Sequence, residues 1–172
     1  MIHKGVIGAV AGGIAVIGIF VFLTNSGMLQ RPLEQEGIGK DVVLNLNSVN
    51  VVSVDEDSAI IEVSFDAFNP NKRSVVLEAV LYTLYANGVR LATDEIGQRT
   101  EGFITGTGRT FTMYGEYSMP LNDKVEVART EFVESVWSDL QNNNVQWHVT
   151  GKFWFTDPVR AGGEERDFDF VV

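Results

Sequence analysis

The sequence contains no cysteine and only two histidines, His3 and His148, in 172 residues. Without cysteine the chain cannot form a disulfide, a thiolate nucleophile or a cysteine-ligated zinc site. Two histidines this far apart do not indicate a histidine-rich metal site. The glycines within residues 104–108 lack the lysine of a phosphate-binding loop, and no Gly-x-Ser-x-Gly nucleophile elbow occurs. We therefore expect a protein that is not an enzyme and that uses no cofactor.

Basic residues are outnumbered by acidic ones: 13 Lys and Arg stand against 23 Asp and Glu, which gives a net charge of −10 at neutral pH. Proteins that bind nucleic acids use clustered Lys and Arg to neutralise phosphates. No basic stripe occurs in this sequence, so we expect no nucleic acid partner, and no small-molecule substrate is evident. The length corresponds to about one domain, which is enough to bury a core.

Residues 5–23 form a run of 19 residues without a charge. A helix needs about 20 apolar residues to cross a bilayer. A cleavable signal peptide is the alternative, but it has a shorter apolar core and a small-x-small cleavage site. The run continues instead into Thr24-Asn25-Ser26-Gly27. We therefore predict that residues 1–23 are an N-terminal transmembrane anchor, inserted through residues 5–23 and retained in the mature protein.

The basic residues around this run bear on its orientation. Lys4 precedes the run, whereas Arg31 and Lys40 follow it. The positive-inside rule counts basic residues near the ends of a span, and here the counts are almost balanced. We favour a single-pass cell membrane protein with the N-terminus in the cytoplasm and the acidic part of the chain outside.

Gly8 and Gly12 form a small-xxx-small pair within this run. Such spacing lets two membrane helices approach closely, which would allow packing against a protein partner or a second copy. Small residues are also common in membrane helices in general. Both interpretations remain open.

Residues 24–40 are polar and are interrupted by glycine and proline, so they are expected to form a linker. Residues 41–172 then hold 10 basic and 21 acidic residues, a net charge of −11. Negative charge repels anionic lipid headgroups. We therefore expect the domain formed by residues 41–172 to stand away from the membrane.

Residues 41–172 are dominated by alternation of apolar and polar side chains, which is typical of β-strands with one buried face. Residues 145–155 show it most clearly, and residues 61–67, 111–119 and 168–170 follow the same pattern. In residues 42–51 the alternation changes phase at Asn47-Ser48, which predicts a bulge or bend.

Asn87-Gly88 predicts a two-residue hairpin turn, because Asn-Gly readily adopts the positive φ angles that such a turn requires. The arms of the hairpin would be residues 75–85 and 89–96.

Residues 123–140 depart from this alternation. Their apolar positions, beginning at Ala128 and ending at Leu140, recur at helical spacing. Asp123 and Glu126 resemble a capping box, and the asparagines at 142–144 suit a helix end. About seven strands and one late helix predict a mostly β fold: a β-sandwich with a helix that closes one end or face.

Asn69-Pro70-Asn71 lies between two predicted strands and upstream of Asn87-Gly88. With this order of elements, residues 64–97 resemble the water stress and hypersensitive response (WHy) domain of late embryogenesis abundant (LEA) type 2, or LEA14-like, proteins. The resemblance covers residues 41–172. It implies an immunoglobulin- or fibronectin-III-like antiparallel β-sandwich without catalysis, associated with desiccation and other stresses and often joined to a membrane anchor.

Two functions are compatible with these features. The first is a membrane-anchored, non-catalytic WHy-domain protein that protects or binds other molecules in the cell envelope. The alternative is a structural or accessory subunit of a membrane protein complex, packed through its transmembrane helix. Detection of a stoichiometric partner would distinguish the second from the first.

The tripeptide Asn69-Pro70-Asn71 is itself expected to be structural. Proline ends a strand because it lacks a backbone donor, and asparagine side chains bond to the backbone of turns. A contact site is the other interpretation, and the family motif alone does not decide between them.

Asp55-Glu56-Asp57 is an acidic cluster at the tip of a predicted hairpin. Three carboxylates could bind calcium through oxygen, but the cluster lacks the spacing of a twelve-residue calcium loop. We favour a solvated turn without a bound cation. His148 lies on the polar side of its strand, and we interpret it as a surface residue.

Overall fold

The computed structural model describes residues 39–98, 109–159 and 162–172, within a single compact unit, Gly39–Val172. This part of the chain contains eight strands and one α-helix. In chain order they are β1 (Val43–Val54), β2 (Ser58–Asn69), β3 (Val75–Ala86), β4 (Val89–Gly97), β5 (Phe111–Met113), β6 (Tyr117–Ala128), α2 (Glu134–Gln141), β7 (Trp147–Thr156) and β8 (Gly163–Val171).

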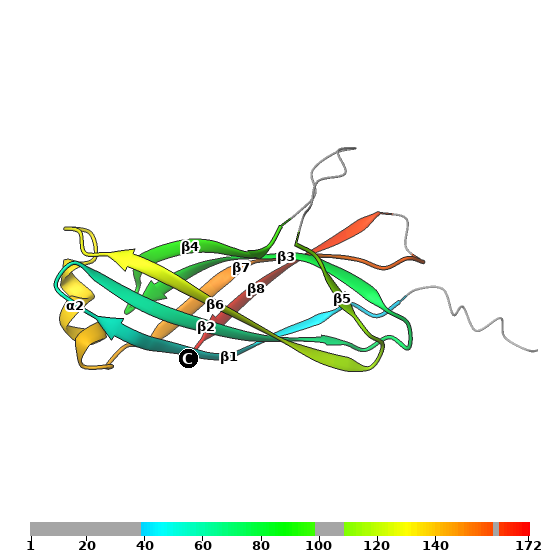
Figure 1. The fold of residues 1–172 in the computed structure, drawn as a ribbon, viewed down its shortest axis with the longest axis horizontal. Helices are drawn as coiled ribbons and strands as arrows, with labels where there is room; N and C mark the ends of the chain where they lie inside the picture. Colours follow the sequence, from blue (N-terminus) through cyan, green and yellow to red (C-terminus); the bar gives the residue numbers. More distant parts are fainter. Residues whose placement is uncertain (1–38, 99–108, 160–161) are drawn as a thin grey trace, which may run out of the picture. The chain divides into compact units, whose positions relative to one another are not determined.

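The strands form two antiparallel sheets (Figure 1). One has the order β1-β2-β6, and the other has the order β4-β3-β7-β8, with the short β5 paired to β3. The sheets share one hydrophobic core. Phe65 of β2, for example, makes edge-to-face contacts with Tyr82 of β3 and Phe168 of β8, each with ring centroids 5.7 Å apart. The prediction of a mostly β, antiparallel sandwich with one helix is confirmed.

The alternation in the sequence corresponds to burial in the strands. In β2 the alternate side chains from Ala59 to Ala67 are fully buried, whereas their neighbours are exposed or half-buried. The predicted hairpin joins β3 and β4, and the φ angles of Asn87 and Gly88 are +48° and +82°. The register of β1 against β2 shifts between Leu46 and Ser48, as the phase change predicted. A second shift, between Val51 and Ser53, has no counterpart in the prediction.

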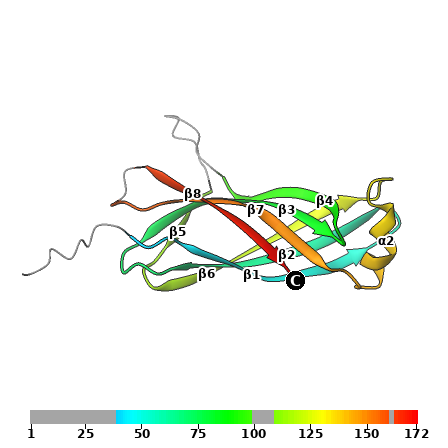
Figure 2. The same cartoon turned by 180° about the vertical axis from the view of Figure 1, so that it is seen from behind.

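The two ends of the sandwich are built from different connections (Figures 1 and 2). At one end lie the turn at residues 55–57, the Asn87-Gly88 turn and residues 129–146, which include α2. We call this the helix end. At the other end the described chain begins at Gly39, and residues 70–74, 114–116 and 157–159 connect the strands. We call this the junction end.

The predicted start of the helix is wrong. Residues 123–128 belong to β6, which pairs with β2 along its whole length, and α2 begins only at Glu134. Leu121, Val125 and Val127 are buried at even spacing, which is the periodicity of a strand with one face on the core. Asp123 and Glu126 therefore form no capping box, and no side chain caps α2 at its N-terminus. Asn142 is the C-cap, in agreement with the predicted helix end.

Residues 111–119 do not form one strand either. β5 pairs with β3, whereas β6 pairs with β2, so the chain crosses from one sheet to the other at Tyr114-Gly115-Glu116. A straight strand is impossible here because Glu116 has a φ of +58°. A Cβ on Gly115 would lie 2.4 Å from the backbone of Lys72, which shows how closely the turns approach.

The predicted transmembrane run at residues 5–23, including Gly8 and Gly12, and most of the predicted linker lie outside the described residues. Within the described ranges, no helix has both the length and the apolar character required to span a membrane.

Candidate functional site

The Asn-Pro-Asn tripeptide lies at the junction end, and its first residue is the last residue of β2. Asn69 is fully buried. Its Nδ2 donates to the carbonyl oxygens of Arg73 at 2.8 Å, Met113 at 3.1 Å and Tyr114 at 3.2 Å. Its Oδ1 accepts from the backbone N–H of Asn71 at 3.0 Å. A single side chain therefore ties the turn after β2 to the crossing between β5 and β6.

Asn71 holds the chain that enters the domain. Its Oδ1 accepts from the backbone N–H of Lys40 at 2.7 Å, and its Nδ2 donates to the carbonyl of the same residue at 2.8 Å. The side-chain amide thus pairs with Lys40 as a neighbouring strand would. Nδ2 also lies 3.0 Å from Oδ1 of Asn69, so the two asparagines are directly linked.

The backbone of the tripeptide adds contacts to the crossing turn. The N–H of Glu116 lies 2.9 Å from the carbonyl oxygen of Asn69 and 2.8 Å from that of Asn71. Pro70, between them, has no N–H to satisfy in this half-buried turn. Residues 40, 69–73 and 113–116 are consequently joined by hydrogen bonds at one place.

An ion pair with a buried carboxylate borders the tripeptide. Arg73 donates from Nε to Oδ1 of Asp157 at 2.8 Å and from Nη2 to Oδ2 at 2.6 Å. The Asp157 side chain is only 1% exposed and also accepts from the backbone N–H of Val159 at 3.1 Å. A Cβ on Gly39 would lie 2.0 Å from Oδ2 of Asp157, so a side chain at residue 39 would require this ion pair to shift.

Sequence reasoning missed Arg73, Asp157 and Gly39. Arg73 and Asp157 are 84 residues apart, and no motif links them. Asp157-Pro158 after a predicted strand was the one available signal, and it indicates a turn rather than an ion pair.

The junction offers little for chemistry or ligand binding. The side-chain amides of Asn69 and Asn71 bond to the backbone and to each other. In the part of the chain that the structure describes, no group of three His, Cys, Asp or Glu side chains could hold a metal ion. These contacts favour the interpretation of the tripeptide as scaffold.

The acidic cluster forms the tip of the β1–β2 hairpin. Oδ1 of Asp55 accepts from the backbone N–H of Ser58 at 2.7 Å and of Asp57 at 2.9 Å. These bonds stabilise the ionised carboxylate and lower the pKa of Asp55. Asp55 thus acts as the acceptor that closes the turn.

Asn87 also connects the hairpin turn to the helix. Its Nδ2 donates to Oδ2 of Asp139 in α2 at 2.8 Å, and its Oδ1 accepts from the backbone N–H of Gln146 at 2.8 Å. The side chain of His148 is 37% exposed. Its Nε2 lies 2.8 Å from Oδ1 of Asp169, and its ring stacks on Tyr85. Each contact is local and connects neighbouring elements.

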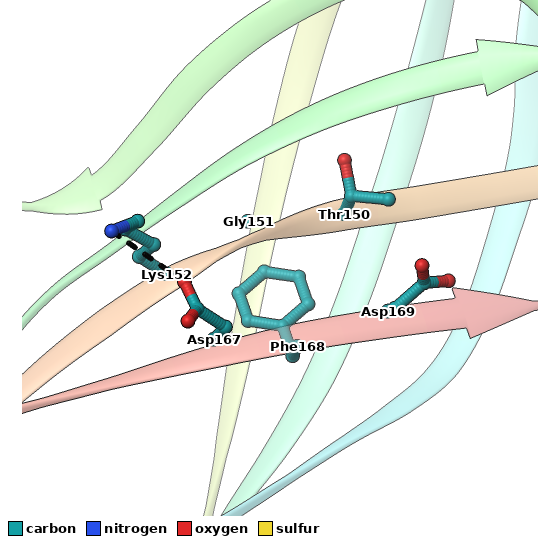
Figure 3. A pocket seen from close by; sticks show the side chains of 6 residues that line it. All are labelled: Thr150, Gly151, Lys152, Asp167, Phe168 and Asp169. Carbon is teal, nitrogen blue, oxygen red and sulfur yellow. Dashed lines mark ion pairs between the residues drawn. The ribbon is translucent and has the colours of Figure 1, made fainter.

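An open groove of about 480 Å³ runs along β7 and β8 (Figure 3). Its lining residues are Thr150, Gly151, Lys152, Asp167, Phe168 and Asp169. Lys152 lies 2.6 Å from Glu165 and 3.5 Å from Asp167, and the hydrogen bond to Glu165 raises the pKa of the lysine. The basic side chain of the groove, Lys152, is therefore paired with carboxylates of β8, whereas Asp169 pairs with His148.

Comparison with known proteins adds information about the fold. No family model matches the chain, and no curated protein matches it. The solution structure of an Arabidopsis thaliana protein is similar, with a TM-score of 0.50 and 10% identity over 83% of this chain and 90% of that one. This similarity shows a shared fold.

Two further solved structures are more distant in shape. The solution structure of a proposed LEA protein has a TM-score of 0.45 and 14% identity, covering 95% of this chain and 88% of that one. The crystal structure of a protein from Archaeoglobus fulgidus has a TM-score of 0.40 and 14% identity, covering 78% of this chain and 98% of that one.

Proposed function

We propose that the chain is a non-catalytic, membrane-anchored protein of the LEA type 2 (WHy) kind. It protects other proteins or membranes against desiccation and related stress in the cell envelope. The observation that carries this proposal is the use of Asn69-Pro70-Asn71, the residues on which the family resemblance depends. The side-chain amides of Asn69 and Asn71 both form hydrogen bonds with the backbone at the end of a strand, so the tripeptide has a defined structural role.

Three further features support the proposal. The β-sandwich is the architecture that the resemblance implies, and its immunoglobulin- or fibronectin-III-like character is part of what we propose. The charged side chains that line the β7–β8 groove all have an ion-pair partner, which suits a protein without a catalytic centre. The uncharged run at residues 5–23 is long enough to be the proposed anchor.

Protection can be tested on the full chain reconstituted in vesicles. A dehydrogenase that loses activity on drying is dried with the vesicles and then rehydrated. We expect it to retain more activity than with vesicles that carry an equal mass of an unrelated single-pass protein. Equal recovery in the two samples would overturn the proposed protective function.

Purification of the full chain in mild detergent tests the alternative of an accessory subunit. The proposal expects a monomer or a homodimer. A second protein that copurifies in a fixed ratio would instead show that the chain is a subunit of a membrane complex.

A further inference from the structure

The two ends of the sandwich differ in charge. Residues 55–57, 87–88 and 129–146 at the helix end carry six carboxylates and a single basic side chain, Arg129. The described connections at the junction end carry three basic and three acidic side chains, namely Lys40, Lys72 and Arg73 against Asp41, Glu116 and Asp157. The acidity of the domain therefore does not extend to the described connections of the junction end.

The junction end also exposes tyrosine. Tyr114 and Tyr117 flank the Gly115-Glu116 turn, and each is 69% exposed. Tyrosine combines an apolar ring with a polar hydroxyl, and it is enriched where membrane proteins meet the lipid headgroups. The helix end exposes an aromatic residue too, Phe132, but its sequence neighbourhood is acidic. Among the described connections, exposed tyrosine rings and the absence of a net negative charge coincide only at the junction end.

The described chain also enters the domain at this same end. Asn71 holds the backbone of Lys40 at the junction end, so the 38 residues that precede the described chain attach there. The side chains of Lys40 and Lys72 are exposed. Basic side chains close to a membrane surface are attracted to anionic headgroups, and the attraction fades within a Debye length.

We propose that the junction end is the surface that the domain presents to a lipid bilayer. Tyr114 and Tyr117 lie at the level of the headgroups, Lys40 and Lys72 face anionic headgroups, and the acidic helix end points away. This inference rests on the proposed function, because it requires the anchor in residues 5–23. It revises the expectation that the net charge keeps the domain off the membrane: only one end is repelled.

The absence of cysteine allows a direct test with single labels. Ser118→Cys places a fluorophore beside Tyr117 at the junction end, and Ser53→Cys places the same fluorophore at the helix end; both serines are exposed. Each labelled full chain is reconstituted in phosphatidylcholine vesicles with a minor fraction of phosphatidylglycerol. Lipids with a nitroxide on the headgroup quench only nearby labels. We expect several-fold stronger quenching of the label at position 118.

Two variants test which side chains are responsible. In the Ser118→Cys background, Tyr114→Ser with Tyr117→Ser should reduce quenching to the level of position 53. Phe132→Ser, the matched loss of an exposed aromatic ring at the helix end, should leave it unchanged. The melting temperature of each labelled chain is measured as well, and only chains with the same value are compared. Unfolding is then not mistaken for release from the membrane.

The outcomes separate the inference from the proposed function. Equal quenching at positions 118 and 53, in chains that float with the vesicles, overturns the bilayer-facing junction end and leaves the anchor intact. Chains that do not float with the vesicles overturn the proposed anchor, and the inference with it. Strong quenching that survives the double tyrosine variant overturns the role of these side chains.

Discussion

Two ion pairs of the same geometry occur at opposite ends of the sandwich. Arg73 at the junction end and Arg129 at the helix end each donate hydrogen bonds from Nε and Nη2 to one carboxylate. The donor–acceptor distances are 2.6–2.8 Å in both pairs. The arginines are similarly exposed, at 33% and 36%, but the carboxylates differ: Asp157 is 1% exposed and Glu134 is 55% exposed.

Burial of the carboxylate, and not hydrogen-bond geometry, therefore decides how much each pair contributes to stability. Water solvates a carboxylate on the surface whether or not its partner is present, so exposed pairs contribute little. A buried carboxylate that loses its partner becomes an uncompensated charge. The junction end is thus held by buried polar contacts, whereas the helix end combines buried apolar residues such as Trp137 and Leu140 with surface charge.

The largest expected effect comes from breaking the buried pair. Arg73→Leu leaves the carboxylate of Asp157 without its guanidinium and should lower the free energy of unfolding by about 3 kcal/mol. Arg129→Leu is the matched control and should change it much less, because Glu134 remains in water. Chemical denaturation of the two variants measures both values. Equal losses would show that burial of the acid is not what distinguishes the two ends.

A smaller effect is expected from crowding the junction without removing any polar group. Gly39→Ala would place a Cβ 2.0 Å from Asp157 and 2.5 Å from Arg73, and should cost about 1–3 kcal/mol as an overpacked site. Gly163→Ala is the control, because its nearest neighbour, Thr156, would be at an ordinary 3.5 Å. Thermal midpoints of the two variants measure how much of the loss comes from crowding at residue 39. A Gly39→Ala chain with the thermal midpoint of the parent chain would contradict close packing of residue 39 against the ion pair.

The smallest effect is a pH dependence at the helix end. The hydrogen bond from Arg129 lowers the pKa of Glu134 below its ordinary value of 4.5. The folded chain therefore binds this proton less readily than the unfolded chain. The contribution to stability is present above pH 4.5 and is lost as the pH falls through the lower, folded pKa.

A titration of the Glu134 carboxyl carbon by NMR should give a midpoint below 4.5 in the parent chain. In Arg129→Leu the midpoint should rise, because the stabilising donor is gone. A midpoint that is the same in both chains would show that the exposed pair does not form in solution.

The strands could be predicted from the sequence because alternation records burial directly. β2, β7 and the β3–β4 hairpin follow patterns in which the buried positions, apart from Asn69 at the end of β2, are apolar. Local turn chemistry marks the end of the hairpin arms. The start of α2 could not be predicted. Ala128 and Phe132 fit a helical stripe by spacing, yet both are exposed in the structure. Residues 123–128 form a strand because they pair with β2, and this pairing partner is remote in sequence.

The candidate site could be predicted only in part. Asn69-Pro70-Asn71 was identified because the tripeptide is contiguous and its residue types favour turns. Its partners were not identified: Lys40, Met113 and Asp157 come from distant segments that meet only in the fold. A backbone carbonyl that accepts a hydrogen bond leaves no trace in residue identity. Most of the junction is therefore invisible in a single sequence.

The hydrogen bonds of Asn69-Pro70-Asn71 favour a structural junction over a contact site. Asn69→Ala in the full chain tests this interpretation most directly, with the free energy of unfolding and the protection of a dried enzyme measured on the same preparation. We expect the free energy of unfolding to fall by about 1–3 kcal/mol, because buried carbonyls lose their donor. The loss of protection should be no larger than the unfolded fraction explains. Unchanged stability with abolished protection would contradict this interpretation.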